Sequence, residues 1–247
     1  PPGRGCAGAL PRSGSAVAYN ETVTHAQEEI EHLKQRLLYM AGLVEHMVFT
    51  GTRALNERKA DLFGEVISRE DQVNALQLEV DDRALKLLAL QHPLAGDLRF
   101  VVAALKATTD LERMADQTVN IVQNTKIIFD LGPAPDLASL EELPHMAEAV
   151  RWMVRESLNA FVNRDVALAR RVLDRDSEVD ALKNKVLERA LGSMRQKSNQ
   201  EGQSALATIL ISRNLERIGD HATNIAEEAI YAVQGTDIRH HAEGQGA

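Results

Sequence analysis

Paired carboxylates that could hold a cation occur at two places in this sequence. Glu112 and Asp116 stand four residues apart, and Glu216 and Asp220 repeat the same spacing. Residues four apart lie on one face of an α-helix, so each pair presents two carboxylates side by side. Crowded carboxylates repel one another, and their hard oxygen atoms suit Mg²⁺, Mn²⁺, Ca²⁺ or iron. Both pairs are therefore candidate metal ligands.

Each pair belongs to a segment that the chain contains twice. The segment Leu-Glu-Arg-Met-Ala-Asp-Gln-Thr-Val-Asn-Ile begins at Leu111. It returns at Leu215 as Leu-Glu-Arg-Ile-Gly-Asp-His-Ala-Thr-Asn-Ile, with an offset of 104 residues (215 − 111). A repeat of this length indicates two copies of one structural unit.

The preceding segments of the two copies also match and carry further acidic residues. The segment that starts at Arg69 corresponds to the one at Arg175, with an offset of 106 residues (175 − 69). If the helices of each copy pack together, these segments bring more carboxylates to the same surface. The additional candidate ligands are Glu70, Asp176 and Asp180.

Two explanations of these acidic stripes remain open, a cation site and an ordinary solvated helix face. Both stripes step by four residues and are expected to lie away from the apolar seam of their helix. His221, which replaces Gln117 in the second copy, is an additional candidate ligand, but we expect it to be a surface histidine. The stripes are Thr108, Glu112, Asp116, Asn120 and Asn124, and Ser212, Glu216, Asp220, Asn224 and Glu228.

The composition favours a helical, water-soluble protein. The chain has 247 residues, with 44% hydrophobic, 26% charged and only 4% aromatic residues. The net charge of −8 gives no support to a nucleic-acid-binding protein, which normally has a basic face. The single cysteine, Cys6, excludes an intramolecular disulfide and a thiolate zinc site. No apolar run approaches the ~20 residues that span a bilayer, so a cytoplasmic protein is expected.

Hydrophobic periodicity predicts an all-α fold of six helices. The breaker Leu131-Gly132-Pro133-Ala134-Pro135-Asp136 separates two halves. We expect two tandem, internally duplicated three-helix bundles, residues 24–131 and 137–234, between a disordered leader (1–23) and a disordered tail (235–247). The predicted helices span residues 25–55, 59–90, 95–129, 140–163, 166–194 and 201–233.

The sequence does not favour a di-iron enzyme or a metal-storage bundle. Such a site needs two helical Glu-x-x-His motifs on facing helices. Glu29-x-x-His32 is one match, and the other, Glu142-x-x-His145, straddles Pro144 at a helix start. A metal-dependent enzyme or a metal-binding scaffold remains an alternative explanation of the acidic residues.

Three segments carry a resemblance to a known family, namely Gln91-His92-Pro93-Leu94-Ala95-Gly96-Asp97-Leu98-Arg99, Asp110-Leu111-Glu112-Arg113-Met114-Ala115-Asp116 and Asn214-Leu215-Glu216-Arg217-Ile218-Gly219-Asp220. They resemble the PhoU family of bacterial phosphate-transport regulatory proteins. The resemblance covers about residues 25–233 and implies two similar three-helix bundles without catalytic activity.

The resemblance also implies a function and partners. Such proteins limit phosphate uptake and restrain the phosphate-starvation response by linking the phosphate ABC transporter, through its ATPase subunit, to a sensor histidine kinase. Peripheral membrane association through these partners and a homodimer are implied as well.

The resemblance further implies divalent or iron metal clusters on the repeated motif. The motif residues are Glu112 and Asp116 in the first half, with Glu70, and Glu216 and Asp220 in the second half, with Asp176 and Asp180. The sequence departs from the family pattern at Asn74, where an acidic residue is common, and Ala115 stands where the second copy has Gly219. We therefore expect the C-terminal cluster to bind metal more tightly.

Overall fold

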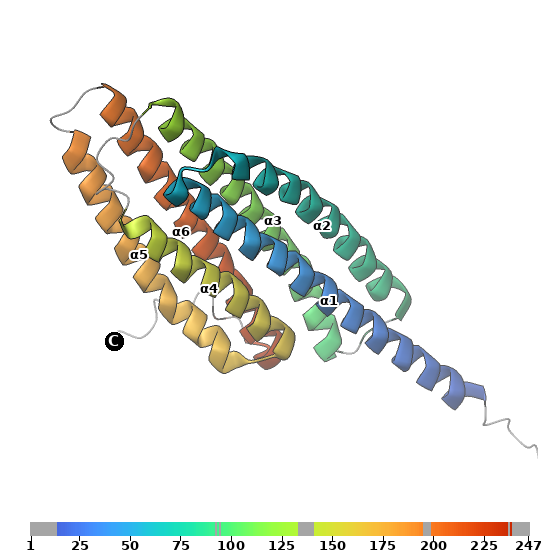
Figure 1. The fold of residues 1–247 in the computed structure, drawn as a ribbon. Coiled ribbons are helices and arrows are strands. Elements are labelled where there is room, and N and C mark those ends of the chain that lie inside the picture. The colour runs from blue at the N-terminus through green and yellow to red at the C-terminus, as the bar shows by residue number, and fades with distance from the viewer. Residues whose placement is uncertain are drawn as a thin grey trace, which may run out of the picture.

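A computed structural model describes residues 14–91, 93, 95–132, 141–194, 199–236 and 238. Within these residues the protein is all-α and has no strand, which confirms the predicted fold class (Figure 1). The α-helices are α1 (Gly14–Glu57), α2 (Phe63–Gln91), α3 (Ala95–Asp130), α4 (Glu142–Asn163), α5 (Val166–Met194) and α6 (Asn199–Gln234). A short 3₁₀ helix, η1 (Ala60–Leu62), precedes α2.

The turns after the first helix of each half show the duplication at backbone level. Arg58 follows α1 with φ 52°, and Arg164 follows α4 with φ 56°. Both residues adopt the left-handed conformation that commonly ends a helix. The amide of Lys59 then donates to the carbonyl of Ala54, and Asp165 repeats this bond in the second half at the same 2.9 Å. Each turn lets the next helix run back along the one before it.

The ends of α2 and α6 also have local causes. Pro93 follows the end of α2 closely, and the residue before a proline resists the helical region. Gly235, with φ 70°, follows α6, and its amide donates to the carbonyl of Tyr231 at 2.8 Å. The predicted interhalf breaker is described only at Leu131 and Gly132, and its residues 133–136 lie outside the described residues.

The start of α1 corrects the predicted leader. The helix begins at Gly14, so residues 14–23 are helical where a disordered segment was expected. The physical reason is that no proline or glycine interrupts residues 15–41, and nucleated helices propagate through such a stretch. Residues 1–13 lie outside the described residues, as does most of the predicted tail.

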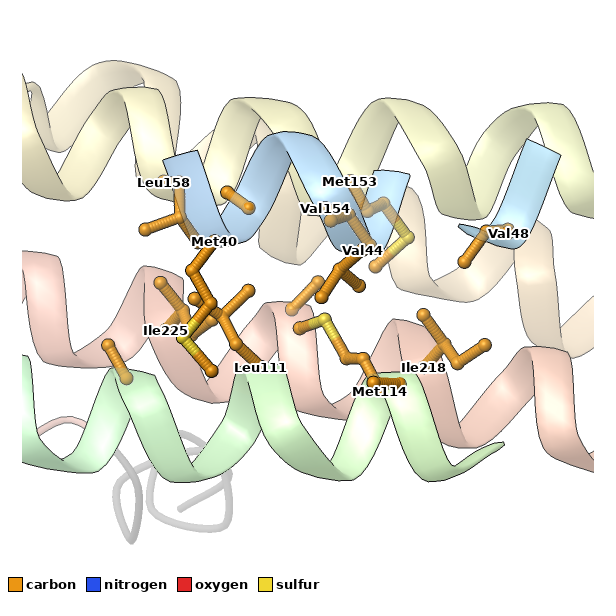
Figure 2. Close-up of a cluster of buried hydrophobic side chains, with 14 of the residues drawn as sticks. Met40, Val44, Val48, Leu111, Met114, Met153, Val154, Leu158, Ile218 and Ile225 are labelled. Atoms are coloured by element: carbon orange, nitrogen blue, oxygen red, sulfur yellow. The ribbon is translucent and has the colours of Figure 1, made fainter. Parts of the chain in front are cut away.

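The two halves share one hydrophobic core. Helix α2 packs on α1 and α3, α5 packs on α4 and α6, and the halves meet where α3 packs on α6 and α1 on α4. Side chains of the four inner helices, α1, α3, α4 and α6, interdigitate in the centre (Figure 2). They include Met40, Val44, Val48, Leu111, Met114, Met153, Val154, Leu158, Ile218 and Ile225. None of the helices among the described residues is long and apolar enough to cross a membrane.

Candidate functional site: two acidic clusters beside the α3–α6 seam

The N-terminal acidic cluster consists of Glu70 and Asn74 of α2 with Glu112 and Asp116 of α3. The amide of Asn74 donates to Glu70 Oε1 at 2.9 Å. Burial raises the pKa of Glu112, and the negative charges of Asp116 and Glu70 raise it further. The predicted carboxylates therefore lie close enough together to repel one another, as the sequence suggested.

Arg113 is the cation nearest to this cluster. Its guanidinium lies 3.4 Å from Glu112 and 3.5 Å from Asp116, and its side chain is 55% exposed. Exposed pairs at such distances contribute little to stability. All three residues belong to α3, so Arg113 does not tie α3 to α2.

The C-terminal acidic cluster contains one carboxylate more. It consists of Asp176 and Asp180 of α5 with Glu216 and Asp220 of α6. Burial raises the pKa of Asp220 to about 6, and repulsion from Glu216, Asp176 and Asp180 adds to this shift. Burial also raises the pKa of Asp176, and repulsion from Asp180 and Glu216 adds to this shift.

Lys183 of α5 is a member of this cluster that the sequence analysis missed. Its ammonium donates to Asp180 Oδ1 at 2.6 Å and to Glu216 Oε1 at 2.8 Å, so it joins α5 to α6. The signal was present in the repeat, because Lys183 corresponds to Gln77 at the 106-residue offset. The additional carboxylate of the second copy, Asp180, is therefore accompanied by an additional positively charged side chain, that of Lys183.

His221 lies between the clusters, at the seam where α6 meets α3. Its Nδ1 is 2.8 Å from Asp110 Oδ1, and its side chain is only 24% exposed. The expected surface histidine is thus only partly exposed, because the packing of α6 on α3 covers most of this position. His221 lies near enough to act electrostatically on both Glu112 and Asp220, whose pKa values are raised overall, so the two clusters flank one seam.

Further polar contacts continue along the seam. The amide of Asn224 donates to Asp110 Oδ1 at 3.1 Å, and the ammonium of Lys106 donates to Glu228 Oε1 at 2.8 Å. A cavity of about 420 Å³ lies beside them. Its lining consists of Leu105, Lys106, Thr109, Asp110, Asn224 and Glu228.

The acidic stripes do not stay on one face, which corrects another expectation. Thr108 is 0% exposed, Ser212 is 1% exposed and Glu228 is 3% exposed, so these ends of the stripes are buried. A step of four residues overshoots one helical turn by about 40°. Over several steps the stripe therefore rotates into the core, and only its middle residues lie in the clusters. The predicted apolar seam is buried, with Leu111 and Ile121 both fully covered.

The side chains do not form a ready-made metal site in this arrangement. Across the part of the chain that the structure describes, no three His, Cys, Asp or Glu side chains are placed to hold one ion. In the C-terminal cluster, Lys183 already contacts the oxygens that a bridging ion would need. In the N-terminal cluster, Asn74 Oδ1 is buried without a hydrogen-bond partner. Such an oxygen is available to a hydrogen-bond donor or to a cation.

Comparison with known proteins identifies the family to which this duplicated fold belongs. The model of the PhoU domain matches residues 37–125 and 143–229, one segment in each half. The phosphate-specific transport system accessory protein PhoU homolog of Pseudomonas putida is 35% identical over 89% of this chain and 87% of that protein. The homolog of Aquifex aeolicus is 34% identical over 86% of this chain and 95% of that protein.

Solved structures agree with the sequence comparison. The crystal structure of PhoU from Pseudomonas aeruginosa matches with a TM-score of 0.80 and 34% sequence identity. The match covers 85% of this chain and 99% of the Pseudomonas aeruginosa chain. The phosphate transport system regulatory protein PhoU from Streptococcus pneumoniae has a TM-score of 0.78 and 25% identity, with coverage of 86% and 98%. The two matched segments, the relatives and the shared fold together show that this chain belongs to the PhoU family.

Proposed function

We propose that this protein regulates phosphate uptake and restrains the phosphate-starvation response when phosphate is plentiful. In this role it works in the cytoplasm as an adaptor between the ATPase subunit of a phosphate ABC transporter and a sensor histidine kinase. The observation that carries the proposal is the match of both halves to the PhoU domain. Relatives that cover most of the chain are named as accessory proteins of phosphate-specific transport.

The acidic clusters supply a surface for this role. They flank the α3–α6 seam and contain seven carboxylates, namely Glu70, Glu112, Asp116, Asp176, Asp180, Glu216 and Asp220. Such a surface attracts a basic partner by charge complementarity, and it also attracts cations. An adaptor needs no catalytic group, and we propose that the protein acts by binding alone, as a homodimer.

Deletion of the gene in the source organism tests the regulatory role. We expect the deletion strain to accumulate phosphate and to express its starvation genes in phosphate-rich medium. The intact gene should restore repression. Normal uptake and normal repression in the deletion strain would refute the proposal.

A binding experiment tests the partners and the surface. We expect the purified protein to bind the transporter ATPase subunit and the kinase cytoplasmic region, with light scattering reporting a dimer. The double variant Asp116→Arg/Asp220→Arg should weaken this binding. The control variant Glu148→Arg/Glu188→Arg changes the charge equally at exposed positions of α4 and α5 and should bind normally. Equal binding by both variants would exclude the acidic clusters as the contact surface.

The alternative is a metal-binding scaffold with no part in phosphate control. The crowding that raises the pKa of Asp220 is the observation in its favour, because a cation relieves such repulsion. Normal phosphate control in the deletion strain, together with bound metal in the purified protein, would favour this alternative.

A further inference from the structure

The position of Lys183 is that of a bridging cation. Its ammonium lies 2.6 Å from Asp180 Oδ1 on its own helix and 2.8 Å from Glu216 Oε1 on α6. The side chains of Lys183 and Glu216 are only 24% and 23% exposed, so the interhelical bond joins two partly buried side chains. Charge-assisted hydrogen bonds of this length are among the strong ones in proteins.

The other half of the molecule has no equivalent of this bridge. At the 106-residue offset, Lys183 corresponds to Gln77 and Asp180 corresponds to Asn74. The N-terminal cluster thus has neutral amides at the two positions where the C-terminal cluster has an acid and a base. Its own cation, Arg113, contacts carboxylates of the same helix only, at 3.4 and 3.5 Å.

We propose that Lys183 is the resident cation of the C-terminal acidic cluster and excludes divalent metal ions from it. A divalent ion would have to displace an ammonium that already contacts oxygens of both helices. Because Lys183 is attached to α5, its effective concentration at the cluster is fixed and high. This inference does not depend on the phosphate-regulatory role.

Protonation of Lys183 supports the geometry. A lysine side chain is ordinarily an ammonium at physiological pH, and its three N–H donors suit the two carboxylates that it contacts. If Lys183 occupies the cluster in this way, an expectation from the sequence is reversed. The extra carboxylate of Asp180 predicted tighter metal binding in the C-terminal cluster, but that carboxylate is a partner of Lys183.

Substitution of the lysine by its counterpart in the first copy tests the proposal. The full chain, freed of metal by chelation, is titrated with Mn²⁺ in a calorimeter, and its thermal midpoint is measured with and without Mn²⁺. We expect Lys183→Gln to bind one Mn²⁺ more per chain than the parent protein. Mn²⁺ should raise the thermal midpoint of this variant, and the further substitution Asp220→Asn should weaken the added binding.

Two controls separate the bridge from a general effect of charge. Lys185→Gln removes an equal charge from an exposed position of α5 and should bind Mn²⁺ as the parent does. Lys183→Arg keeps the positive charge and should not gain a site. If Lys183→Gln binds no more Mn²⁺ than Lys185→Gln, the proposal is overturned.

A measurement without any change at Lys183 covers the case in which Lys183→Gln does not fold. Glu216→Gln in the otherwise unchanged chain removes a carboxylate that a metal ion would need in the C-terminal cluster. Since we propose that no ion enters there, the Mn²⁺ stoichiometry and affinity of Glu216→Gln should equal those of the parent. A loss of Mn²⁺ binding in this variant would show that the cluster admits metal in spite of Lys183.

Discussion

His221 Nδ1 lies 2.8 Å from Asp110 Oδ1, so a hydrogen bond between these two residues joins the second half of the protein to the first. The duplication does not predict this bond. At the 104-residue offset, His221 corresponds to Gln117 and Asp110 corresponds to Asn214. The His221–Asp110 pair therefore occurs on one side of the α3–α6 seam only, beside the side-chain amide of Asn224, which donates to the same oxygen.

The contribution of this pair can be measured by a double-mutant cycle. We expect His221→Gln and Asp110→Asn each to lower the free energy of unfolding by about 1 kcal/mol, because each removes a partly buried hydrogen bond. Together they should cost less than the sum of the single effects. Chemical denaturation of the four proteins gives the coupling energy, and strictly additive effects would show that the pair contributes nothing.

Gly219 offers a stabilising substitution. The first copy has Ala115 at this position, and a methyl group on Gly219 would meet Met153 and Val179 at 3.7 Å, which is ordinary van der Waals contact. Gly219→Ala should therefore raise the free energy of unfolding by roughly 0.5–1 kcal/mol, since glycine is unfavourable inside a helix.

Gly51 is the matched control for this substitution. A methyl group on Gly51 would come within 3.3 Å of the side chain of Thr118. We expect Gly51→Ala to gain less than Gly219→Ala when both are compared by thermal denaturation. A decrease in stability for Gly219→Ala would show that α6 cannot accommodate the methyl group.

The C-terminal cluster should make the stability of the metal-free protein depend on pH. Folding raises the pKa of Asp220 from its usual value of 3.8 to about 6. The folded protein therefore binds more protons than the unfolded chain between these values. The contribution of Asp220 to the free energy of unfolding should therefore fall as the pH rises from about 4 to 6, and the loss should persist at higher pH.

Asp220→Asn tests this pH dependence. The amide cannot ionise, so the variant should be more stable than the parent at pH 7, by on the order of 1 kcal/mol after allowance for solvent screening. The difference should shrink towards pH 4. Denaturation curves across this range, recorded with a chelator present, would contradict the assignment if the two proteins kept a constant difference.

The shared core predicts that the two halves unfold together. Leu111 of α3 and Leu215 of α6 are both 0% exposed and belong to one buried cluster. Leu111→Ala and Leu215→Ala should each cost about 2–5 kcal/mol. Calorimetry should show one transition that moves to lower temperature in both variants. Two transitions, with only one of them shifted by each variant, would mean that the halves are independent.

The sequence by itself determined the helical class, the duplication and the family. Hydrophobic residues at three- and four-residue spacing reveal a helix without reference to its neighbours, and α5 was predicted at its observed bounds, Val166–Met194. The pairing of Glu112 with Asp116 follows in the same way from helical geometry. These features depend on residues close together in the chain, so local pattern is sufficient to find them.

Tertiary structure alone decided what the acidic residues contact. Lys183 and Glu216 are far apart in sequence, and no periodicity indicates that α5 and α6 pack in the register that joins them. His221 was expected on the surface, yet the packing of α6 on α3 places it against Asp110. Register between helices is set by how side chains of the whole core fit together, which is a property of all the helices at once. For this reason the spacing of the carboxylates was readable from the sequence, whereas the cation that one cluster already contains was not.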